Sequence, residues 1–389
     1  MNILMVTDIF FPDVMGGSGR MVNEISKRLV RRGHNVHVLT RRANRNLSVE
    51  ENLEGVIIHR YNVSFQSAVA YTVSSLINTS RTFNKIFKET PFDLINFHQP
   101  FSALGIVLSR RARKIPKIHT FHSSWPKEYE IKTGSCGVGS FIRKWIERRA
   151  LSSCKKIVVL SEYSREQILN IHKVPLNQIE IIPGGVDTEG FAPASDKANV
   201  KAELGIPSNK FLLFTVRNLV PRMGLENLIN AMVIIIKEKP NAVLVIGGSG
   251  FLEERLKKQV EDLGLESYVK FAGLIEEERL PLYYRAADLF ILPSRCLEGF
   301  GLVTLEALSC GTPVLGTPVG GTKEILGRLD KELLFKDIEA KSMAEKILLY
   351  LSSKDLLMLS KKCRDFVVSN YSWDRVVSKY ERLYSKFVS

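Results

Sequence analysis

The sequence predicts an α/β protein with two doubly wound parallel sheets. Short runs rich in valine and isoleucine alternate with amphipathic stretches, as in β-α-β units around parallel sheets. This alternation occurs twice along the chain. The length of 389 residues also exceeds one ordinary core, because a domain typically has about 150 residues.

The expected strands form two series, and helical patterns separate most of their members. The strands of the first half are expected at residues 2–7, 36–40, 56–60, 94–97, 118–121, 157–160 and 179–182. Those of the second half are expected at residues 212–216, 243–246, 269–272, 289–292 and 314–316.

A turn-rich stretch separates the two series. Pro183, Gly184 and Gly185 precede the largely polar residues 187–198. We therefore expect a Rossmann-like domain at about residues 1–185 and a second at about 190–370. The segment from about 370 to 389 has apolar residues at helical spacing, and we expect it to pack back on the first domain.

The composition is that of a globular protein, with 45% apolar and 25% charged residues. The apolar stretch 68–77 is too short and too polar to cross a bilayer, and Met1 leads directly into a strand without a signal-peptide pattern. The five cysteines form no CxxC or His-spaced pair, which favours reduced thiols. We expect a cytoplasmic protein.

The positive charge is concentrated in the first half. Residues 1–189 hold 27 Lys and Arg against 16 Asp and Glu, or +11 of the total +14. Residues 143–156 read as a basic amphipathic helix, with apolar neighbours at Phe141, Ile142, Trp145, Ile146 and Leu151. We favour an ordinary helix with this stripe in the core. Peripheral contact with anionic lipid at the inner face of the membrane is the alternative.

A glycine turn follows the first expected strand. Gly16 and Gly17 precede a helix that begins near Ser18. Glycines allow a ligand to approach the backbone, and a helix N-terminus presents N–H groups and a partial positive charge to phosphate. The pattern is not GxGxxG, and a tight turn that merely needs glycine explains it equally well.

The second half contains two glutamates and two further glycine turns. Glu298 lies in a loop before an expected helix that contains Glu306, eight residues later. Carboxylates at the carboxyl edge of a parallel sheet can accept hydrogen bonds from sugar and ribose hydroxyls. Gly320 and Gly321 precede another helical segment and offer a second place for phosphate.

These motifs resemble those of the retaining glycosyltransferase family 4, whose members have the GT-B fold. Glu298 to Glu306 is similar to the E-x7-E motif of that family. The matching segments occur in the family's order along nearly the whole chain: Gly16-Gly17, Phe121-His122-Ser123, Pro183 to Asp187, Val269 to Gly273, and Gly320 to Glu324. The resemblance implies two Rossmann-like domains that face a central cleft.

The resemblance also implies roles for residues. Glu306 would bind the ribose hydroxyls and Glu298 those of the donor sugar, while the backbone at Gly273 and Leu274 would read the base. His122 would lie beside the transferred sugar. The remaining implied donor-binding positions are the backbone near Gly16, Gly17 and Gly321 and the segment Phe300, Gly301 and Leu302. Attack from the front face, with the leaving phosphate helping to deprotonate the acceptor, would require no protein nucleophile.

One position departs from the family pattern of an arginine followed by Lys-Gly. Met223 occupies the lysine position before Gly224. With six-residue spacing Arg217 matches the arginine, whereas five-residue spacing would place Asn218 there. Because cations stabilise a leaving diphosphate, we expect Arg222 to replace the missing lysine.

No Asp-x-Asp triplet occurs, so we expect catalysis without a metal and without another cofactor. UDP-glucose is the first expectation for the donor, with GDP-mannose and UDP-GlcNAc still open. The basic first domain favours a glycan or lipid-linked glycan acceptor of cell-envelope polysaccharide. The alternatives are a non-catalytic nucleotide-sugar-binding subunit and a GT-B nucleotide-sugar epimerase. Nucleic-acid binding is disfavoured because no aromatic-basic sheet motif or recognition helix is visible.

Overall fold

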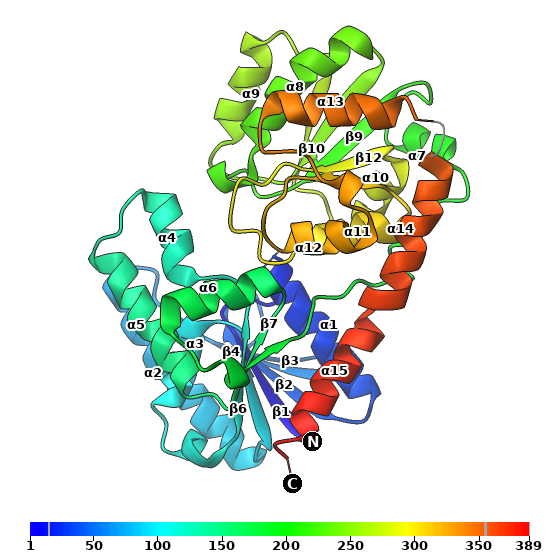
Figure 1. Ribbon diagram of the computed structural model, residues 1–389. Coiled ribbons are helices and arrows are strands. Elements are labelled where there is room, and N and C mark those ends of the chain that lie inside the picture. Colours follow the sequence, from blue (N-terminus) through cyan, green and yellow to red (C-terminus); the bar gives the residue numbers. More distant parts are fainter. Residues whose placement is uncertain (15, 354–355, 389) are drawn as a thin grey trace. The chain divides into compact units, whose positions relative to one another are not determined.

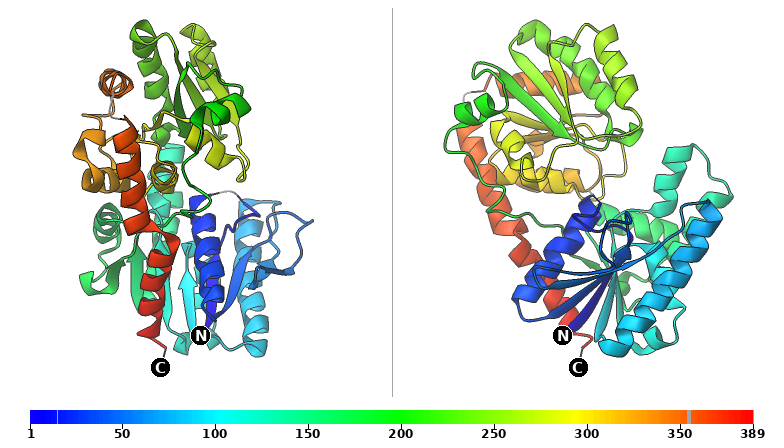
Figure 2. Two further views of the ribbon diagram at one scale, coloured as in Figure 1. Left: turned by 90° about the vertical axis from the view of Figure 1, so that its right-hand side faces the viewer. Right: turned by 180° about the vertical axis from the view of Figure 1, so that it is seen from behind.

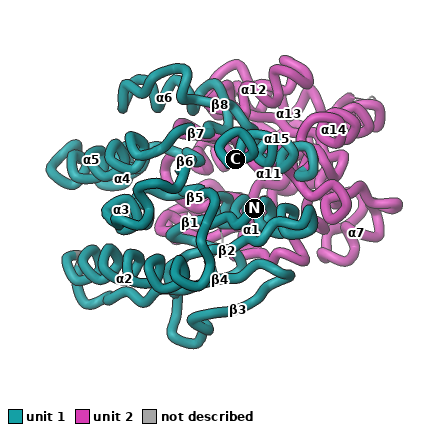
Figure 3. The backbone as a smooth tube through the Cα atoms, turned by 90° about the horizontal axis from the view of Figure 1, so that it is seen from below, with its two compact units in different colours: residues 1–184, 373–389 teal, residues 185–372 magenta. Residues whose placement is uncertain are grey.

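The computed structural model describes residues 1–14, 16–353 and 356–388. The chain forms two compact units, coloured separately in Figure 3. Unit 1 contains residues 1–184 and the C-terminal segment from Trp373, and unit 2 contains residues 185–372.

Unit 1 is built on an eight-stranded sheet with the strand order β3-β4-β2-β1-β5-β6-β7-β8. All neighbouring strands are parallel except β3, which pairs antiparallel with β4. The strands are β1 (Asn2–Thr7), β2 (Asn35–Arg41), β3 (Glu50–Leu53), β4 (Val56–Tyr61), β5 (Leu94–Phe97), β6 (Lys117–Phe121), β7 (Lys156–Val159) and β8 (Ile179–Ile181).

Helices cover this sheet on two sides, as Figures 1 and 3 show. One side has α2, α3 and α5, which contact one another in that order, and the other side has α1 and α15. The helices are α1 (Gly17–Arg31), α2 (Ala68–Glu89), α3 (Pro100–Val107), η1 (Arg111–Lys114), α4 (Trp125–Thr133), α5 (Val138–Ser152), α6 (Glu162–His172), η2 (Leu176–Gln178) and α15 (Trp373–Ser385).

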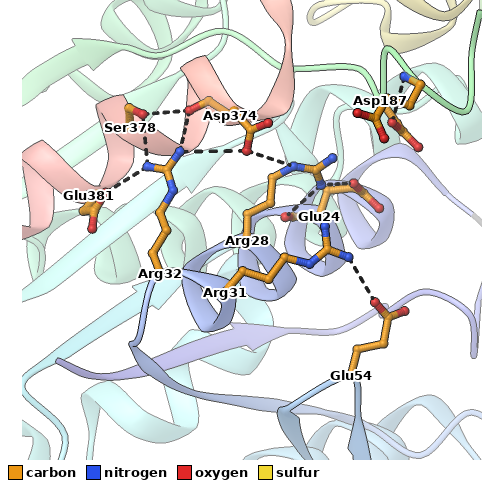
Figure 4. A network of polar contacts seen from close by, with 10 residues as sticks. Glu24, Arg28, Arg31, Arg32, Glu54, Asp187, Asp374, Ser378 and Glu381 are labelled. Atoms are coloured by element: carbon orange, nitrogen blue, oxygen red, sulfur yellow. Dashed lines mark hydrogen bonds and ion pairs between the residues drawn. The ribbon is translucent and has the colours of Figure 1, made fainter.

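The C-terminal helix α15 lies beside α1 in both views of Figure 2. Arg32 donates hydrogen bonds to Glu381 Oε2 at 2.8 Å and to the Asp374 carbonyl at 2.8 Å (Figure 4). Exposed ion pairs contribute only about 0–1 kcal/mol each. The apolar face of α15 is buried and includes Val376, Val377, Tyr380, Leu383 and Tyr384. Burial of this face therefore holds α15 on unit 1 more than the ion pairs do.

Unit 2 has a five-stranded parallel sheet with the order β11-β10-β9-β12-β13. Its strands are β9 (Phe211–Val216), β10 (Ala242–Gly247), β11 (Val269–Gly273), β12 (Leu289–Leu292) and β13 (Val314–Gly316). Its helices are α7 (Lys197–Glu203), η3 (Pro221–Met223), α8 (Leu225–Glu238), α9 (Glu253–Asp262), α10 (Leu280–Ala286), α11 (Leu302–Ser309), α12 (Gly320–Leu329), η4 (Lys331–Leu333), α13 (Ala340–Leu351) and α14 (Leu356–Tyr371).

Every expected strand is present, and the doubly wound α/β architecture is confirmed. The sequence reasoning missed β3, whose residues Glu50, Glu51 and Asn52 are exposed at the edge of the sheet. This strand has no apolar face to bury, so it leaves no period-2 pattern in the sequence.

The interpretation of the basic helix as an ordinary core helix is wrong for three of its apolar residues. Ile146 and Leu151 are buried, as that interpretation requires. Phe141, Ile142 and Trp145 are instead 72%, 50% and 55% exposed. The periodicity identified the residues that share a face of α5, but the inward face of this helix also contains the polar residue Glu147.

Candidate active site

In unit 2, polar side chains gather where the strand order reverses. The chain leaves β9 in one direction across the sheet and reaches β12 on its other side. Ligands of doubly wound sheets bind at the carboxyl ends of the strands at such a switch point. Arg217 directly follows β9, and Ser294 and Glu298 follow β12. The topology therefore brings together residues that lie about eighty positions apart in the sequence.

Arg217 and Glu298 form a buried ion pair at this edge of the sheet. They are 8% and 7% exposed, and a guanidinium nitrogen of Arg217 donates to Glu298 Oε2. Ser294 Oγ lies 2.9 Å from the same carboxylate oxygen. Met223 Sδ accepts from Arg217 Nη2 at 2.7 Å, so methionine supports the arginine at the position where the resemblance implies a lysine.

Glycine at 320 fixes the loop that carries Glu298. Gly320 has φ +61°, and a Cβ there would lie 2.0 Å from the carbonyl oxygen of Glu298. Only glycine combines this left-handed conformation with such a close approach. The Gly321 N–H donates to the same carbonyl at 2.8 Å. This amide is therefore engaged within the Glu298 loop, and the expectation that amides near Gly321 meet phosphate or sugar stays a prediction.

Three side-chain oxygens surround Gly301, the residue before α11. A Cβ on Gly301, whose φ is +86°, would lie 2.7 Å from Thr322 Oγ1, 3.1 Å from Thr304 Oγ1 and 3.7 Å from Glu298 Oε1. The two threonine hydroxyls are buried and have no hydrogen-bond partner among the described residues. Thr304 lies near the start of α11 and Thr322 near the start of α12. Two helix N-termini and three oxygens thus form a polar cradle, defined by Glu298, Gly301, Thr304 and Thr322.

Glu306 lies on α11 and is 3% exposed. Tyr284 of α10 donates its hydroxyl hydrogen to Glu306 Oε2 at 2.7 Å. Tyr284 is fully buried and packs among Phe191, Phe214 and Phe290. Tyr284 therefore fixes one oxygen of the Glu306 carboxylate through a side chain that cannot turn away.

The other predicted donor-binding residues of unit 2 lie on neighbouring loops. Gly273 ends the edge strand β11 with φ +66°, and Leu274 after it is 65% exposed. Phe300 is buried, whereas Leu302 begins α11 with an intermediate exposure. Arg222 lies in η3, where its Nη1 donates to the Leu297 carbonyl at 3.0 Å. Arg222 thus contacts the loop that carries Glu298.

In unit 1, the glycine turn lies at the N-terminus of α1. Gly16 and Gly17 are exposed, and Gly17 begins this helix of 15 residues. Asp13 in the same loop is bonded through both carboxylate oxygens to Arg60 of β4, at 2.6 Å and 2.9 Å. The two side chains are 1% and 2% exposed. This buried pair attaches the loop before the glycines to the sheet.

His122 follows β6 and is half-buried beside His98, which follows β5. His98 Nδ1 and His122 Nε2 are 3.1 Å apart. Burial lowers the pKa of His122 to about 4. The pKa of His98 is also well below its usual value, first through burial and then through His122. Both rings are therefore neutral at pH 7 and can share one proton along this hydrogen bond.

Sequence reasoning missed Asp8 and Gln99, which follow β1 and β5 at the switch point of unit 1. Gln99 Oε1 accepts from Thr7 Oγ1 at 2.6 Å and from the Asp8 N–H at 2.5 Å. Gln99 Nε2 donates to Ser18 Oγ at 3.1 Å, which ties α1 to the sheet. Burial raises the pKa of Asp8 to about 6, although hydrogen bonding to Ser102 and the charge of Arg41 oppose this shift. Proximity to the strand ends was the signal that could have identified both residues.

The structure brings several of the predicted residues together in unit 2. Unit 2 brings Arg217, Arg222 and Glu298 together, and it adds Ser294, Thr304 and Thr322, which sequence reasoning did not single out. Within the described parts of the chain, no group of three His, Cys, Asp or Glu side chains could hold a metal ion.

Comparison with known proteins identifies the class to which this arrangement belongs. Sucrose-phosphate synthase from Thermosynechococcus elongatus superimposes with a TM-score of 0.83 at 23% identity, covering 99% of this chain and 98% of that one. HepE from Anabaena, solved with UDP-glucose, gives a TM-score of 0.78 at 19% identity, covering 99% and 100%. The two doubly wound units, each with polar residues at its switch point, have the GT-B fold.

Sequence profiles specify the family within this class. The profile described as Glycosyltransferase Family 4 matches residues 15–190, and that described as Glycosyl transferases group 1 matches residues 196–372. The alpha-monoglucosyldiacylglycerol synthase of Streptococcus pneumoniae is 30% identical over 328 residues, which are 81% of this chain and 70% of that relative. The chain belongs to glycosyltransferase family 4.

Proposed function

We propose that this glycosyltransferase is a retaining, metal-independent hexosyltransferase that uses a UDP-sugar, with UDP-glucose as the first candidate. The observation that carries the proposal is the polar cradle around Gly301. Its Thr304 and Thr322 hydroxyls are buried without a hydrogen-bond partner among the described residues. Because buried polar groups normally have partners, a ligand with several hydroxyls is the natural occupant, and a hexose is such a ligand.

The ion pair next to the cradle suggests how the donor is held. Arg217 is neutralised by Glu298 before any ligand binds. A diphosphate carries more negative charge than one carboxylate, so it competes for the guanidinium, whose planar donors suit phosphate oxygens. In this proposal Arg217 turns to the diphosphate, and Glu298 then accepts hydrogen bonds from the sugar hydroxyls.

Arg222 supplies the second cation for the leaving diphosphate in this proposal. It lies in the short helix that ends at Met223, and it bonds the Leu297 carbonyl next to Glu298. Cationic stabilisation of the leaving group lowers the barrier to transfer, and preorganised donors of this kind typically contribute about 2.7–4 kcal/mol. No metal ion is then needed to neutralise the developing charge.

Retention follows if the acceptor attacks from the face that the diphosphate leaves. The leaving phosphate oxygen takes the proton of the acceptor hydroxyl, so the C1–O bond to phosphate breaks as the new glycosidic bond forms. His122 contributes as a neutral imidazole, because its pKa of about 4 keeps it uncharged at pH 7. It can therefore accept or donate a hydrogen bond to a sugar hydroxyl without adding charge.

Glu306 is assigned to the ribose, and Leu274 to the nucleobase. Tyr284 holds Glu306 Oε2 in place, which preorganises the carboxylate for a vicinal diol. Leu274 is 65% exposed at the end of β11 and offers an apolar contact to the face of a base. HepE, which shares this fold, was solved with UDP-glucose, and this supports UDP-glucose as the first donor to test.

We propose a glycan or lipid-linked glycan acceptor, used on the cytoplasmic side in the synthesis of cell-envelope polysaccharide or exopolysaccharide. The relative from Streptococcus pneumoniae is named as an enzyme that makes a glycolipid. Sucrose-phosphate synthase, with the same fold, is named for a soluble product, so the fold alone leaves the acceptor class open. The basic character of unit 1 favours an anionic acceptor.

A non-catalytic nucleotide-sugar-binding subunit is the second candidate, and Met223 is the observation that favours it. Met223 is 5% exposed and accepts a hydrogen bond from Arg217, so it takes the place of a phosphate-binding cation with a neutral sulfur. In this case the chain would bind UDP but would not release it from UDP-glucose.

The first experiment is a thermal-shift panel with UDP, GDP, ADP and their sugar conjugates in EDTA, because a ligand of the folded state raises the melting temperature. We expect the largest shift with UDP-glucose, and a smaller one in Glu306→Gln. UDP release from UDP-glucose, also in EDTA, then separates an enzyme from a binding subunit. Release of α-glucose, observed first by NMR, supports retention. Strict dependence on added Mg²⁺ would refute the metal-independent mechanism.

A further inference from the structure

We propose that a basic cavity on unit 1 binds a soluble ligand with two or more adjacent phosphate groups. The cavity has a volume of about 610 Å³, which lies within the range of about 300–1,000 Å³ that small-molecule sites occupy. Five cations line it: Arg81, Lys85, Lys88, Arg110 and Arg111. This basic cavity is a binding site separate from glycosyl transfer, and it does not rest on the proposed function.

Two segments of unit 1 form the walls of the basic cavity. The C-terminal half of α2 carries Arg81, Lys85 and Lys88, which are four and three residues apart and therefore share one helix face. The segment at the start of η1 carries Arg110 and Arg111. The helix rises by about 10 Å between Arg81 and Lys88. Several phosphate groups in a row can therefore each meet a cation.

Hydrogen bonds join the two walls at Asn84 of α2. Ser109 Oγ donates to Asn84 Oδ1 at 2.9 Å, and Arg111 Nη1 donates to the Asn84 carbonyl oxygen at 2.7 Å. Behind the walls, Phe83 of α2 and Ala112 of η1 belong to the same buried apolar cluster. The cavity is therefore formed before a ligand binds, and a preformed site avoids the cost of ordering its side walls.

The five cations of the cavity lack a counter-charge. Among the described residues none of them forms an ion pair, and Glu89 is the only acid in the described lining. Five positive charges against one negative charge leave a surplus of +4. Lys88 lies in the last turn of α2, where the helix dipole favours a cation. The dipole does not account for the other four, whose mutual repulsion an anion of high charge would relieve.

The chemistry of the lining selects phosphate groups. Arginine binds phosphate oxygens through two parallel N–H groups, and lysine binds them as a point charge. The described lining residues include no aromatic ring on which a nucleobase could stack. They also include no apolar side chain that could enter the acyl boundary of a bilayer. A compact soluble ligand that is recognised through its phosphates alone therefore fits the cavity better than a nucleic acid or a membrane.

The basic cavity lies at the sheet edge opposite to the candidate active site of unit 1. The helix α2 ends shortly before β5, and the segment with Arg110 and Arg111 precedes β6. These two strands are parallel neighbours, so both of them begin at the amino edge of the sheet. His98 and His122 instead follow the same two strands, at the carboxyl edge. The ligand of the cavity is therefore distinct from any substrate that His122 contacts.

Titration calorimetry of the purified full chain with inorganic tripolyphosphate, in EDTA and at about 50 mM salt, tests the site. We expect tripolyphosphate to bind at least tenfold more tightly than inorganic phosphate, and added salt to weaken it because salt screens the cations. The double variant Arg81→Glu with Lys85→Glu should lower the affinity at least tenfold. Both side chains are exposed, so this variant should keep the melting temperature of the free wild-type protein.

Two controls separate the cavity from general attraction and from the phosphate-binding cations of unit 2. Arg148→Glu with Arg149→Glu changes the net charge by the same amount on exposed residues of α5 in the same unit. It should change the affinity for tripolyphosphate less than about threefold, because these charges are screened. Arg222→Ala removes a cation from the unit 2 cluster and should leave the affinity for tripolyphosphate unchanged.

Four results would overturn the proposal. Wild-type protein that does not bind tripolyphosphate at millimolar concentration has no such site. An equal loss of affinity in the α5 variant would attribute binding to net charge alone. A loss in Arg222→Ala, with Arg81→Glu and Lys85→Glu binding normally, would assign the anion to unit 2. Binding to phosphatidylglycerol vesicles through Arg81 and Lys85, without tripolyphosphate binding, would assign the cations to lipid headgroups.

Failure of the proposed function has a different signature. A chain that binds tripolyphosphate in the basic cavity but neither binds UDP nor releases it from UDP-glucose would count against the proposed function. The assignment of the cavity would then stand, because its variants and controls use no nucleotide sugar.

Discussion

Replacing Glu298 by glutamine should lower the stability of the free protein and raise its affinity for UDP. The carboxylate neutralises Arg217 in a site where the two residues are 7% and 8% exposed. Glutamine has nearly the same size and can keep the hydrogen bonds with Ser294 and Arg217, so the variant removes the charge and little else. The opposite signs of the two effects distinguish this prediction from a general loss of structure.

The size of each effect follows from the burial of the pair. Removing one partner of a buried ion pair costs about 3–5 kcal/mol, and the retained hydrogen bonds favour the lower limit. For a domain of this size, about 3 kcal/mol corresponds to a fall of about 6–12 °C in melting temperature. Removing a negative charge near the diphosphate should gain on the order of 1–2 kcal/mol, or about tenfold in the Kd of UDP.

Thermal unfolding by circular dichroism and titration calorimetry with UDP measure the two effects. Glu254→Gln on α9 is the matched control, because its side chain is 88% exposed and its ion pair with Lys257 lies at the surface. That change should stay within about 0.5 kcal/mol. An unchanged melting temperature in Glu298→Gln, or weaker UDP binding, would show that Glu298 does not neutralise Arg217.

Three further predictions concern the loop, the second cation and the pH dependence. Gly320→Ala should destabilise unit 2 by more than about 2 kcal/mol, because a Cβ would lie 2.0 Å from a backbone carbonyl at φ +61°. Gly327→Ala in the same helix, with nothing within 4 Å, should raise stability by about 0.5–1 kcal/mol; similar unfolding curves for the two would contradict this. Arg222→Ala should reduce UDP release from UDP-glucose about 100-fold or more, and a wild-type rate would leave Arg217 as the sole phosphate cation. Burial raises the pKa of Asp8 from 3.8 to about 6, so the stability contributed by its protonated form is present below pH 4 and lost as pH rises through 6. Asp8→Asn should therefore raise the melting temperature more at pH 7.5 than at pH 4.5, and equal shifts at both values would refute the assignment.

The strands were predictable because burial on both faces leaves continuous apolar runs in the sequence. The strand β10 (Ala242–Gly247) is buried at all six positions, and its central residues 243–246 were predicted without a structure. The strand β3 was not, because Glu50 and Glu51 are exposed at a sheet edge, where the backbone pairing alone defines the strand. Polar edge strands give no hydrophobic periodicity from which to predict them.

The orientation of α5 could not be predicted from the sequence, for a different reason. Periodicity identifies which residues share a helix face, but burial depends on what the rest of the fold provides. Here Glu147 points inward because His172, twenty-five residues later, is placed to receive it. That pairing turns Phe141 and Trp145 outward, whereas hydrophobicity alone favours the reverse.

The candidate site likewise contains residues that the sequence identified and residues that only the structure reveals. Glu298 and Arg217 were found as chemistry-bearing residues, but their mutual neutralisation depends on β9 and β12 being neighbours in the sheet. Thr304 and Thr322 carry no signal of their own, since hydroxyl residues are common everywhere on a chain. Only the structure shows that their two hydroxyl oxygens lie within 3.1 Å of the position that a Cβ on Gly301 would occupy.

At the carboxyl edge of the unit 1 sheet, the group that titrates near pH 6 is a carboxylate and not a histidine. A rate that changes near pH 6 would ordinarily be attributed to His122, because unperturbed histidine titrates at about 6.5. Burial lowers the pKa of His122 to about 4 and that of His98 well below the usual value. Burial raises the pKa of Asp8 to about 6 at the end of the neighbouring strand β1. The charge of this edge therefore changes between pH 5 and 7 through Asp8, while the two imidazoles stay neutral and keep their hydrogen bond.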